Sequence, residues 1–368
     1  MKNFFLRYKK LHIWLFSTLA VLAVLYLARG NRGWMNALAD RVILPLRRGL
    51  GDLSYRVPFS VMEVLYVLAA LLGLGYVVWT IAAVVRARGR RGRRAYAGVL
   101  GAVCICVTLY TLFFFLWGLG FWTDSFQDKS GIRAQEVAVE DLQAVTAYFA
   151  ERTAEAAGAV PRDENGCFDV SWQEILAESP HVYDDLEGEF PFLAFEDHGV
   201  KPMFFSRLMS RMDFTGFYCA YTGESNVNID SPACLLPSTA AHELAHQRGI
   251  ASEQECNFLA VLAATTSGDP AYVYSGWLMG YIYLGNALYT ADPEAYWAIR
   301  ETLPETVLAD LAENNAYWAQ FRDSAAKKVS NKVYDGMLKA YGESRGIQSY
   351  GTVVDLLVVY YREGAKRC

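Results

Sequence analysis

Residues 96–122, YAGVLGAVCICVTLYTLFFFLWGLGFW, include no charged side chain and decide the class of this protein. An apolar run of about 20 residues is long enough to cross the hydrocarbon core of a bilayer as a helix. Two earlier runs, at about 11–28 and 64–85, have the same character. A cleavable signal peptide is the alternative for the first run, but no convincing small-residue cleavage site follows Ala28. We therefore predict three transmembrane helices.

Charge divides the chain into two parts. Residues 1–95 carry 16 Lys and Arg against three Asp and Glu, whereas the remainder carries 18 against 36. The basic residues flank apolar runs, as membrane anchors do, so nucleic acid is not an expected partner. The sequence predicts a membrane domain at residues 1–122 and a soluble domain at residues 123–368.

Arginines set the predicted orientation. The Arg86–Arg94 loop has six Arg in nine residues and, with the basic tail at residues 2–10, predicts a cytoplasmic amino terminus. The protein is then a multi-pass protein of the cell membrane with its carboxy-terminal domain outside the cytoplasm. A cytoplasmic partner or anionic lipid would suit the same loop. Residues 29–59 carry six more Arg, widely spaced, and could form an interfacial helix.

Hydrophobic periodicity predicts a mainly helical soluble domain with a small sheet. The aromatic, β-branched and glycine-punctuated residues 216–230 are typical of a strand or hairpin. Residues 271–290 are apolar, but Ser275, Gly276 and Asn286 interrupt them, which indicates a core helix before a fourth span. The other expected elements are a helix at 132–157, a loop at 158–167, a helix at 171–178 and mostly helix from 238 to 363.

The soluble part holds five of the seven cysteines, an odd number, so at least one stays unpaired within a monomer. Cys219 with Cys234 is the first candidate for a disulfide. Buried thiols are the equally weighted alternative.

The segment 239–257, TAAHELAHQRGIASEQECN, carries the chemistry. His242 and His246 are four residues apart, so on a helix both imidazoles lie on one face, as two ligands of a tetrahedral zinc do. Glu243, one step round the helix, can act as general base on a water without binding the metal. An incidental histidine pair on a surface helix is the alternative.

The third ligand is expected just beyond the histidines. Gly249 permits a positive φ that ends the helix, and Ser252 then predicts the next N-cap, with Glu255 completing a capping box. Glu253 would lie in the first turn, on the same face as Asn257 and directed back toward the histidines. We favour Glu253 as ligand and keep Glu255 as the alternative.

This segment resembles the gluzincin metallopeptidases, which have HExxH followed by Glu-x-x-x-Asp/Asn. The whole chain is similar to DUF3810, a family of bacterial membrane proteins. The resemblance implies an α+β zincin-like domain, Zn²⁺ as cofactor, His242, His246 and Glu253 as ligands, and Glu243 as base. Asn257 stands where many gluzincins have an Asp that orients a ligand histidine, and an amide raises ligand basicity less than a carboxylate. The similarity to DUF3810 covers the three spans and residues 216–224, 242–249, 257–260 and 348–357.

The leading hypothesis is a membrane-anchored zinc metallopeptidase that hydrolyses peptide or protein substrates outside the cytoplasm. The strand-like segment before the site helix would hold an extended substrate by main-chain pairing, or else is an ordinary core hairpin. The alternative function is a catalytically inactive, zinc-stabilised sensor or scaffold. An intramembrane protease or transporter is disfavoured, because His242 lies about 120 residues beyond the last span.

Overall fold

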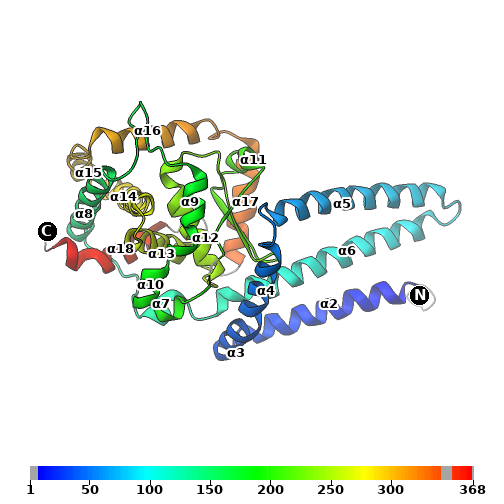
Figure 1. The fold of residues 1–368 in the computed structure, drawn as a ribbon. Helices are drawn as coiled ribbons and strands as arrows, with labels where there is room; N and C mark the ends of the chain where they lie inside the picture. The colour runs from blue at the N-terminus through cyan, green and yellow to red at the C-terminus, as the bar shows by residue number, and fades with distance from the viewer. Residues whose placement is uncertain (1–6, 197, 341–349, 367–368) are drawn as a thin grey trace. The chain divides into compact units, whose positions relative to one another are not determined.

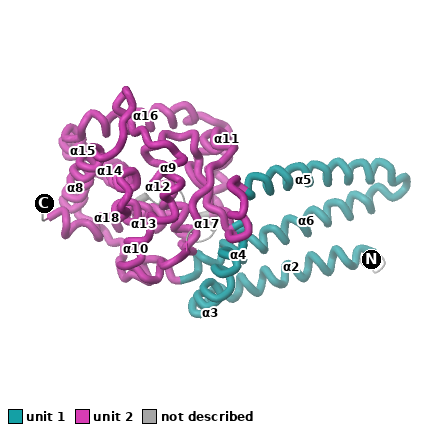
Figure 2. Tube along the Cα trace, viewed as in Figure 1, with its two compact units in different colours: residues 1–50, 61–123, 220–222 teal, residues 51–60, 124–219, 223–368 magenta. Residues whose placement is uncertain are grey.

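The computed structural model describes residues 7–196, 198–340 and 350–366, which are mainly helical with a small three-stranded sheet (Figure 1). The chain divides into two compact units (Figure 2). Unit 1 comprises residues 1–50, 61–123 and 220–222, and unit 2 comprises residues 51–60, 124–219 and 223–368. Two short segments, 51–60 and 220–222, therefore belong to a different unit from their neighbours in sequence.

Unit 1 contains three helices long and apolar enough to cross a membrane, namely α2 (Lys9–Ala28), α5 (Val61–Arg86) and α6 (Arg91–Leu116). Large apolar side chains are exposed on them, for example Leu27 at 81% and Leu72 at 73%, which favours a lipid surrounding. The three predicted apolar helices are confirmed. The predicted end of the third is wrong, because α6 stops at Leu116 and a 3-10 helix, η2 (Gly118–Trp122), follows where two glycines weaken the α-helix.

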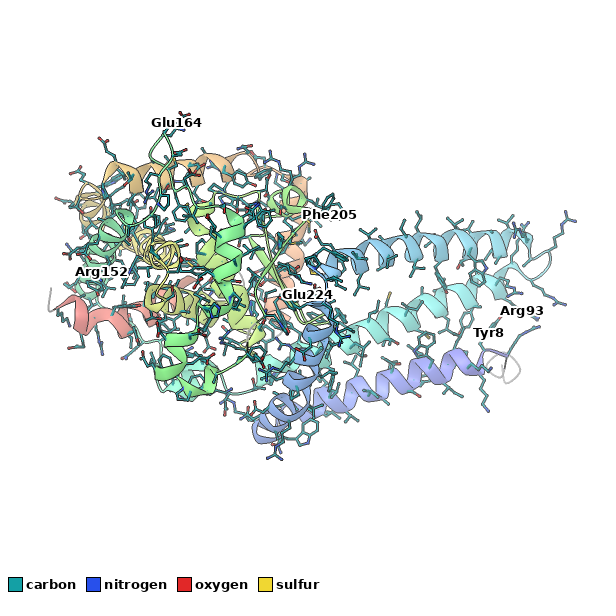
Figure 3. The ribbon with its side chains drawn as sticks, in the orientation of Figure 1. Tyr8, Arg93, Arg152, Glu164, Phe205 and Glu224 are labelled. Atoms are coloured by element: carbon teal, nitrogen blue, oxygen red, sulfur yellow. The ribbon has the colours of Figure 1, made fainter. Side chains whose placement is uncertain are left out.

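Close backbone contacts and polar bonds join these helices. The hydroxyl of Tyr8, which precedes α2, donates a 2.9 Å hydrogen bond to the carbonyl of Arg93 in α6 (Figure 3). The hydroxyl of Tyr76 in α5 donates a 2.7 Å bond to the carbonyl of Gly98 in α6. A Cβ at Gly98 would lie 2.3 Å from Cγ2 of Thr80. Small residues thus let α5 and α6 approach closely, as in other membrane helix pairs.

Residues 32–54 form nearly continuous helix. They comprise α3 (Arg32–Leu38), a π-helical turn η1 (Ala39–Ile43) and α4 (Leu44–Ser54). The side chain of Asn31 begins α3 by accepting a 3.0 Å hydrogen bond from the amide of Trp34. A helix in the 29–59 region is therefore confirmed, while its place in the membrane interface stays a prediction.

Unit 2 begins with short helices around the longer α8 (Val139–Ala157). The helix predicted from residue 132 starts seven residues late, because Gln127 accepts a 2.9 Å bond from the amide of Ala134 and keeps that segment extended. The predicted helix at 171–178 is confirmed as α9, with a capping box between Ser171 and Glu174. The remaining elements here are α7 (Phe126–Ser130), α9 (Trp172–Glu178), η3 (Ser179–His181), α10 (Asp184–Glu189), η4 (Pro191–Leu193) and α11 (Ser206–Arg211).

The sheet has the order β1-β3-β2, so β3 (Glu224–Val227) is central. β1 (Lys201–Pro202) pairs with it in parallel, and β2 (Gly216–Cys219) pairs with it antiparallel, Gly216 opposite Val227. The predicted hairpin is thus confirmed, with Gly223 at a positive φ of 68° in its turn. β2 forms one edge of the described sheet.

A buried lysine holds residues 51–60 on the sheet of unit 2. Nζ of Lys201 lies 2.6 Å from Oε1 of Glu224 and donates to the carbonyls of Ser54 and Phe59 at 2.9 and 3.0 Å. Both charged side chains are almost fully buried (Glu224 is labelled in Figure 3). Such a pair is tolerated inside a protein when its remaining donors are satisfied, as they are here.

The rest of unit 2 is helical. Helix α14 (Pro270–Ala291) runs through the core, and a Cβ at Gly280 would lie 2.1 Å from the ring of Phe149 in α8, so these two helices pack closely. α14 is not among the three candidate spans, and the predicted core helix is confirmed. The other elements are η5 (Ala233–Leu235), α12 (Leu236–Gln247), α13 (Glu253–Thr266), α15 (Pro293–Arg300), α16 (Glu305–Ala319), α17 (Ala325–Ala340) and α18 (Tyr350–Ala365).

The cysteine pair expected as a disulfide does not form one. Cys219 lies at the end of β2 and Cys234 in η5, and both are buried thiols. Buried thiols are therefore the correct alternative for these two residues.

Candidate metal centre

The site is built on the end of α12. Its last turn closes with two bonds typical of a Schellman motif, from the amide of Ile250 to the carbonyl of Ala245 and from the amide of Gly249 to that of His246. Gly249 has φ 92°, the left-handed conformation predicted for it. The chain therefore turns back sharply, and α13 begins at Glu253, close to the histidines.

Both histidines use Nδ1 to hold their rings in place. Nδ1 of His242 donates to Oδ1 of Asn257 at 2.8 Å, and Nδ1 of His246 donates to the carbonyl of Ile250 at 2.8 Å. In a neutral imidazole this leaves the lone pair on Nε2, the usual arrangement of a metal-binding histidine. The two rings lie 4.9 Å apart, almost perpendicular to each other. Asn257 thus fixes the orientation of the His242 ring.

Glu253 lies opposite the Nε2 atoms of both histidines. Its Oε2 is 3.1 Å from Nε2 of His242, and its Oε1 is 3.6 Å from Nε2 of His246. Ligand atoms about 2.0–2.1 Å from a tetrahedral zinc lie roughly 3.3 Å apart, and each carboxylate oxygen lies near that distance from one of the two Nε2 atoms. Burial opposes ionisation of Glu253, but the charge and hydrogen bonds of His246 and His242 in their protonated form outweigh it and hold the pKa of this carboxyl well below its usual value.

Glu255, the alternative ligand, points elsewhere. Its carboxylate accepts hydrogen bonds from the amides of Phe126 at 2.9 Å and Gln127 at 3.2 Å, at the start of α7. Ser252 is the N-cap residue of α13 as predicted, but its side chain makes no capping bond. The predicted capping box is therefore wrong, because a helix start 129 residues away in sequence takes the Glu255 carboxylate.

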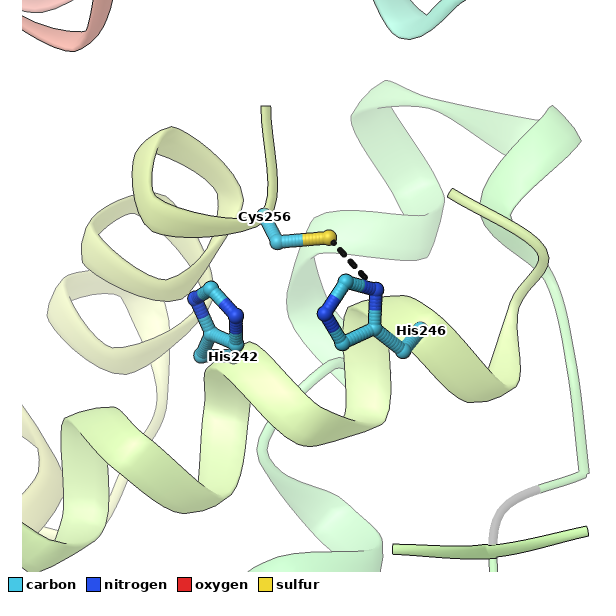
Figure 4. Close-up of side chains that lie close together, drawn as sticks. All are labelled: His242, His246 and Cys256. Atoms are coloured by element: carbon cyan, nitrogen blue, oxygen red, sulfur yellow. Dashed lines mark hydrogen bonds between the residues drawn. The ribbon is translucent and has the colours of Figure 1, made fainter. Parts of the chain in front are cut away.

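Cys256 is a neighbour of the site that sequence reasoning did not select. Its Sγ lies 3.2 Å from Nδ1 of His246 (Figure 4), and ligand atoms of His242, His246 and Cys256 fall within 4.8 Å of one another. The thiol faces the ring nitrogen that donates to Ile250, whereas Glu253 faces the opposite one. His246 therefore presents Nε2 toward Glu253 and Nδ1 toward Cys256.

Glu243, the next residue after His242, has a buried carboxyl group. It is 4% exposed, and its Oε2 has no hydrogen-bond partner among the described residues. Gly216 of β2 lies directly against this carboxyl, since a Cβ there would be 2.3 Å from Oε1. Burial raises the pKa of Glu243 to about 8, with a further rise from Glu253 and an opposing effect of His242. A buried carboxyl without a partner is costly and calls for a polar occupant beside it.

Tyr334 of α17 is the second neighbour that the sequence did not reveal. Its hydroxyl donates a hydrogen bond to Oε1 of Glu253. Burial and the negative charge of Glu253 raise the pKa of this phenol well above its usual value, so it stays a donor. The chain has 23 tyrosines, and nothing in the spacing of this one singles it out.

A family profile described as "Protein of unknown function (DUF3810)" matches residues 41–358. The chain belongs to the DUF3810 family. No curated protein and no solved structure matches it, so the zincin-like fold remains a prediction.

The donor set in this DUF3810 chain suits zinc. Two imidazole nitrogens and one carboxylate are a common ligand set of catalytic zinc, which keeps a fourth position open for water or substrate. The unpartnered oxygen of Glu243 is the group that such a water would satisfy. His242, His246 and Glu253 are the residues that would hold the ion.

A second group of potential ligands in this DUF3810 chain is already occupied. Cys167, Asp310 and Glu313 lie together, but Asp310 binds Arg162 at 2.6 Å. The same carboxylate also accepts bonds from the amide of Phe168 and the hydroxyl of Tyr274. It acts as the buried partner of a guanidinium and a phenol, not as a vacant metal ligand.

Proposed function

We propose that this chain is a membrane-anchored, zinc-dependent metallopeptidase. The observation that carries the proposal is the convergence of two Nε2 atoms on the Glu253 carboxylate, within electrostatic reach of the buried Glu243 carboxyl, whose Oε2 has no partner in the described structure. In this proposal His242, His246 and Glu253 hold the metal. Glu243 transfers protons. The arrangement around α12 supports an active site of the zincin type.

The chain's own residues have separate tasks. Asn257 and the carbonyl of Ile250 fix the imidazole rings of His242 and His246 so that both Nε2 atoms face one point. Bound zinc would polarise the scissile carbonyl and lower the pKa of a water to about 7. Glu243 would take the proton of that water and return it to the departing amine. In the metal-free protein burial raises the pKa of this carboxyl, and a carboxyl with a raised pKa is a stronger proton acceptor.

Substrate would bind along β2. This strand pairs with β3 on one side and forms an edge of the described sheet. Its first residue, Gly216, lies against Glu243, so a peptide that extends the sheet would pass close to the proposed base. Main-chain pairing of this kind gives affinity without demanding a particular sequence.

The experiment uses the full chain, purified in detergent and loaded with zinc, on a library of peptides. We expect hydrolysis that Glu243→Gln reduces by at least about 1,000-fold, as loss of a general base commonly does. The bound zinc should remain near one per chain in that variant and disappear in His246→Ala. The exposed residues Glu164 and His181 offer matched controls, and Glu164→Gln and His181→Ala should change neither quantity.

Two results would count against the proposal. Absence of zinc in folded wild-type protein would remove the metal site altogether. Zinc binding without hydrolysis, together with a cellular phenotype that survives Glu243→Gln and is lost in His246→Ala, would favour the inactive sensor or scaffold.

A further inference from the structure

Helix α17 presents one polar face to the site. Lys327, Asn331 and Tyr334 are spaced four and three residues apart, so they share a face of the helix. Nζ of Lys327 lies 2.9 Å from Asp213, and the amide of Asn331 donates to the same carboxylate at 3.4 Å. Lys327 and Asn331 of α17 therefore both bind Asp213, which lies outside the helix.

Asp213 is itself in an unusual conformation. Its φ of 68° is left-handed, and no other non-glycine residue in the described part of the chain has a positive φ. A Cβ disfavours that conformation. The turn it makes leads from α11 to β2, and it places Phe214 edge-on against the ring of Tyr334, with centroids 5.6 Å apart.

These contacts fix where the hydroxyl of Tyr334 lies. Phe214 supports the ring, the two bonds to Asp213 hold the helix, and the hydroxyl donates to Oε1 of Glu253. The other carboxylate oxygen, Oε2, is then the one directed at Nε2 of His242. A carboxylate without such a partner can rotate or offer both oxygens to a metal.

We propose that Tyr334 is a positioning residue, which holds Glu253 so that the carboxylate binds zinc through one oxygen, and that the Lys327–Asp213 pair sets this position through α17. The inference rests on the metal site of the proposed function. It explains how Oε2 of Glu253 lies 3.1 Å from Nε2 of His242 while Oε1, which is 3.6 Å from Nε2 of His246, accepts the hydrogen bond of Tyr334.

Metal affinity tests the role of Tyr334 independently of any activity. The full chain in detergent is stripped of metal, and its zinc dissociation constant is measured by competition with a chromophoric chelator. Tyr334→Phe removes only the hydroxyl and keeps the ring against Phe214. We expect an affinity loss of about 10–100-fold, the usual effect of removing a group that orients a ligand. Tyr289→Phe, at a half-exposed tyrosine of α14, is the matched control and should leave the affinity unchanged.

Cobalt substitution gives a second readout. Four-coordinate Co²⁺ absorbs more strongly in the visible range than five-coordinate Co²⁺, so a carboxylate released to bind through both oxygens should weaken the band in Tyr334→Phe. The wild-type band should be intense. Equal spectra and zinc affinities within twofold of each other would overturn the inference while leaving the proposed function intact.

A double-mutant cycle tests the tether. Lys327→Met should weaken zinc binding in the wild-type background, but it should have no further effect when Tyr334 is already Phe, because the two act through one contact. Additive losses would show that Lys327 acts by another route and would overturn that half of the inference. If wild type and His242→Ala bind zinc equally poorly, both the proposed function and this inference fail.

Discussion

Gly216 has no side chain, and this lets β2 pack directly against the carboxyl of Glu243. Gly216 brings the backbone of β2 against the carboxyl, where any Cβ would lie 2.3 Å from Oε1. The strand excludes water from one side of Glu243 and leaves Oε2 without a partner in the described structure. The close approach of β2 thus contributes to the burial that raises the pKa of Glu243.

This burial predicts a pH dependence of stability in the metal-free protein. Because folding raises the pKa of Glu243 from 4.5 to about 8, the folded state favours the protonated carboxyl. The associated stability is complete below pH 4.5 and is lost as the pH rises through 8, by about a few kcal/mol. Glu243→Gln cannot ionise, so its thermal unfolding midpoint should fall less than that of wild type between pH 5 and pH 9.

The measurement is thermal unfolding in the presence of a metal chelator, followed by near-ultraviolet circular dichroism. Glu164→Gln, at an exposed loop position, corrects for the loss of one carboxylate elsewhere. Parallel pH profiles of wild type and Glu243→Gln would contradict the buried, raised carboxyl.

At the scale of elements, the turn after α12 connects helix geometry to the metal site. Gly249 ends the helix at φ 92°, and the next residue, Ile250, supplies the carbonyl that orients His246. Gly249→Ala should destabilise the protein by about 1–2 kcal/mol, because a Cβ disfavours this backbone conformation. It should also weaken zinc binding, because the carbonyl of Ile250 is displaced.

Unfolding midpoints and zinc affinity of Gly249→Ala test this expectation. Gly268→Ala is the control, since Gly268 has no positive φ and a Cβ there would have no atom within 4 Å. Equal stability of the two alanine variants would show that the turn tolerates a side chain.

The same region shows how far the sequence alone leads. Helical spacing predicted that His242 and His246 share a face, and the glycine rule predicted the turn at Gly249, because both depend on neighbours in the chain. The partner of Glu255 lies 129 residues away and that of Glu253 in α17 lies 81 residues away. Contacts at such distances follow from tertiary packing, so periodicity and capping rules missed the role of Glu255 at α7 and of Tyr334 at the site.

For the whole molecule, the charge distribution predicts which parts face the cytoplasm. The arginine-rich turn between α5 and α6 should stay inside, and unit 2 should lie outside. In intact cells a membrane-impermeant maleimide should therefore label Glu164→Cys, whose position is exposed on unit 2. It should label Arg90→Cys only after the cells are opened. Labelling is compared with the parent chain, and the reverse pattern would invert the topology.

The fold class was largely predictable at this scale, because three long apolar runs and one hairpin leave strong local patterns. The division of the chain into two units was harder to predict from the sequence. The sequence placed residues 51–60 in the membrane domain, yet Lys201 binds the carbonyls of Ser54 and Phe59, and the segment belongs to unit 2. Tyr55 and Asp52 bond unit 2 as well, to Ser225 and His198. These partners lie more than 140 residues away in sequence, so no local pattern predicts the assignment.

Lys201 has a practical consequence for anyone who wants a soluble form of this protein. A fragment cut at the boundary after Thr123 would omit Ser54 and Phe59, and with them two of the three acceptors of a buried ammonium. An unsatisfied buried charge costs more than a simple surface contact. A fragment in which residues 51–60 are joined by a short linker to residue 124 should therefore give a higher yield of folded protein. A fragment that simply starts at residue 124 should give less.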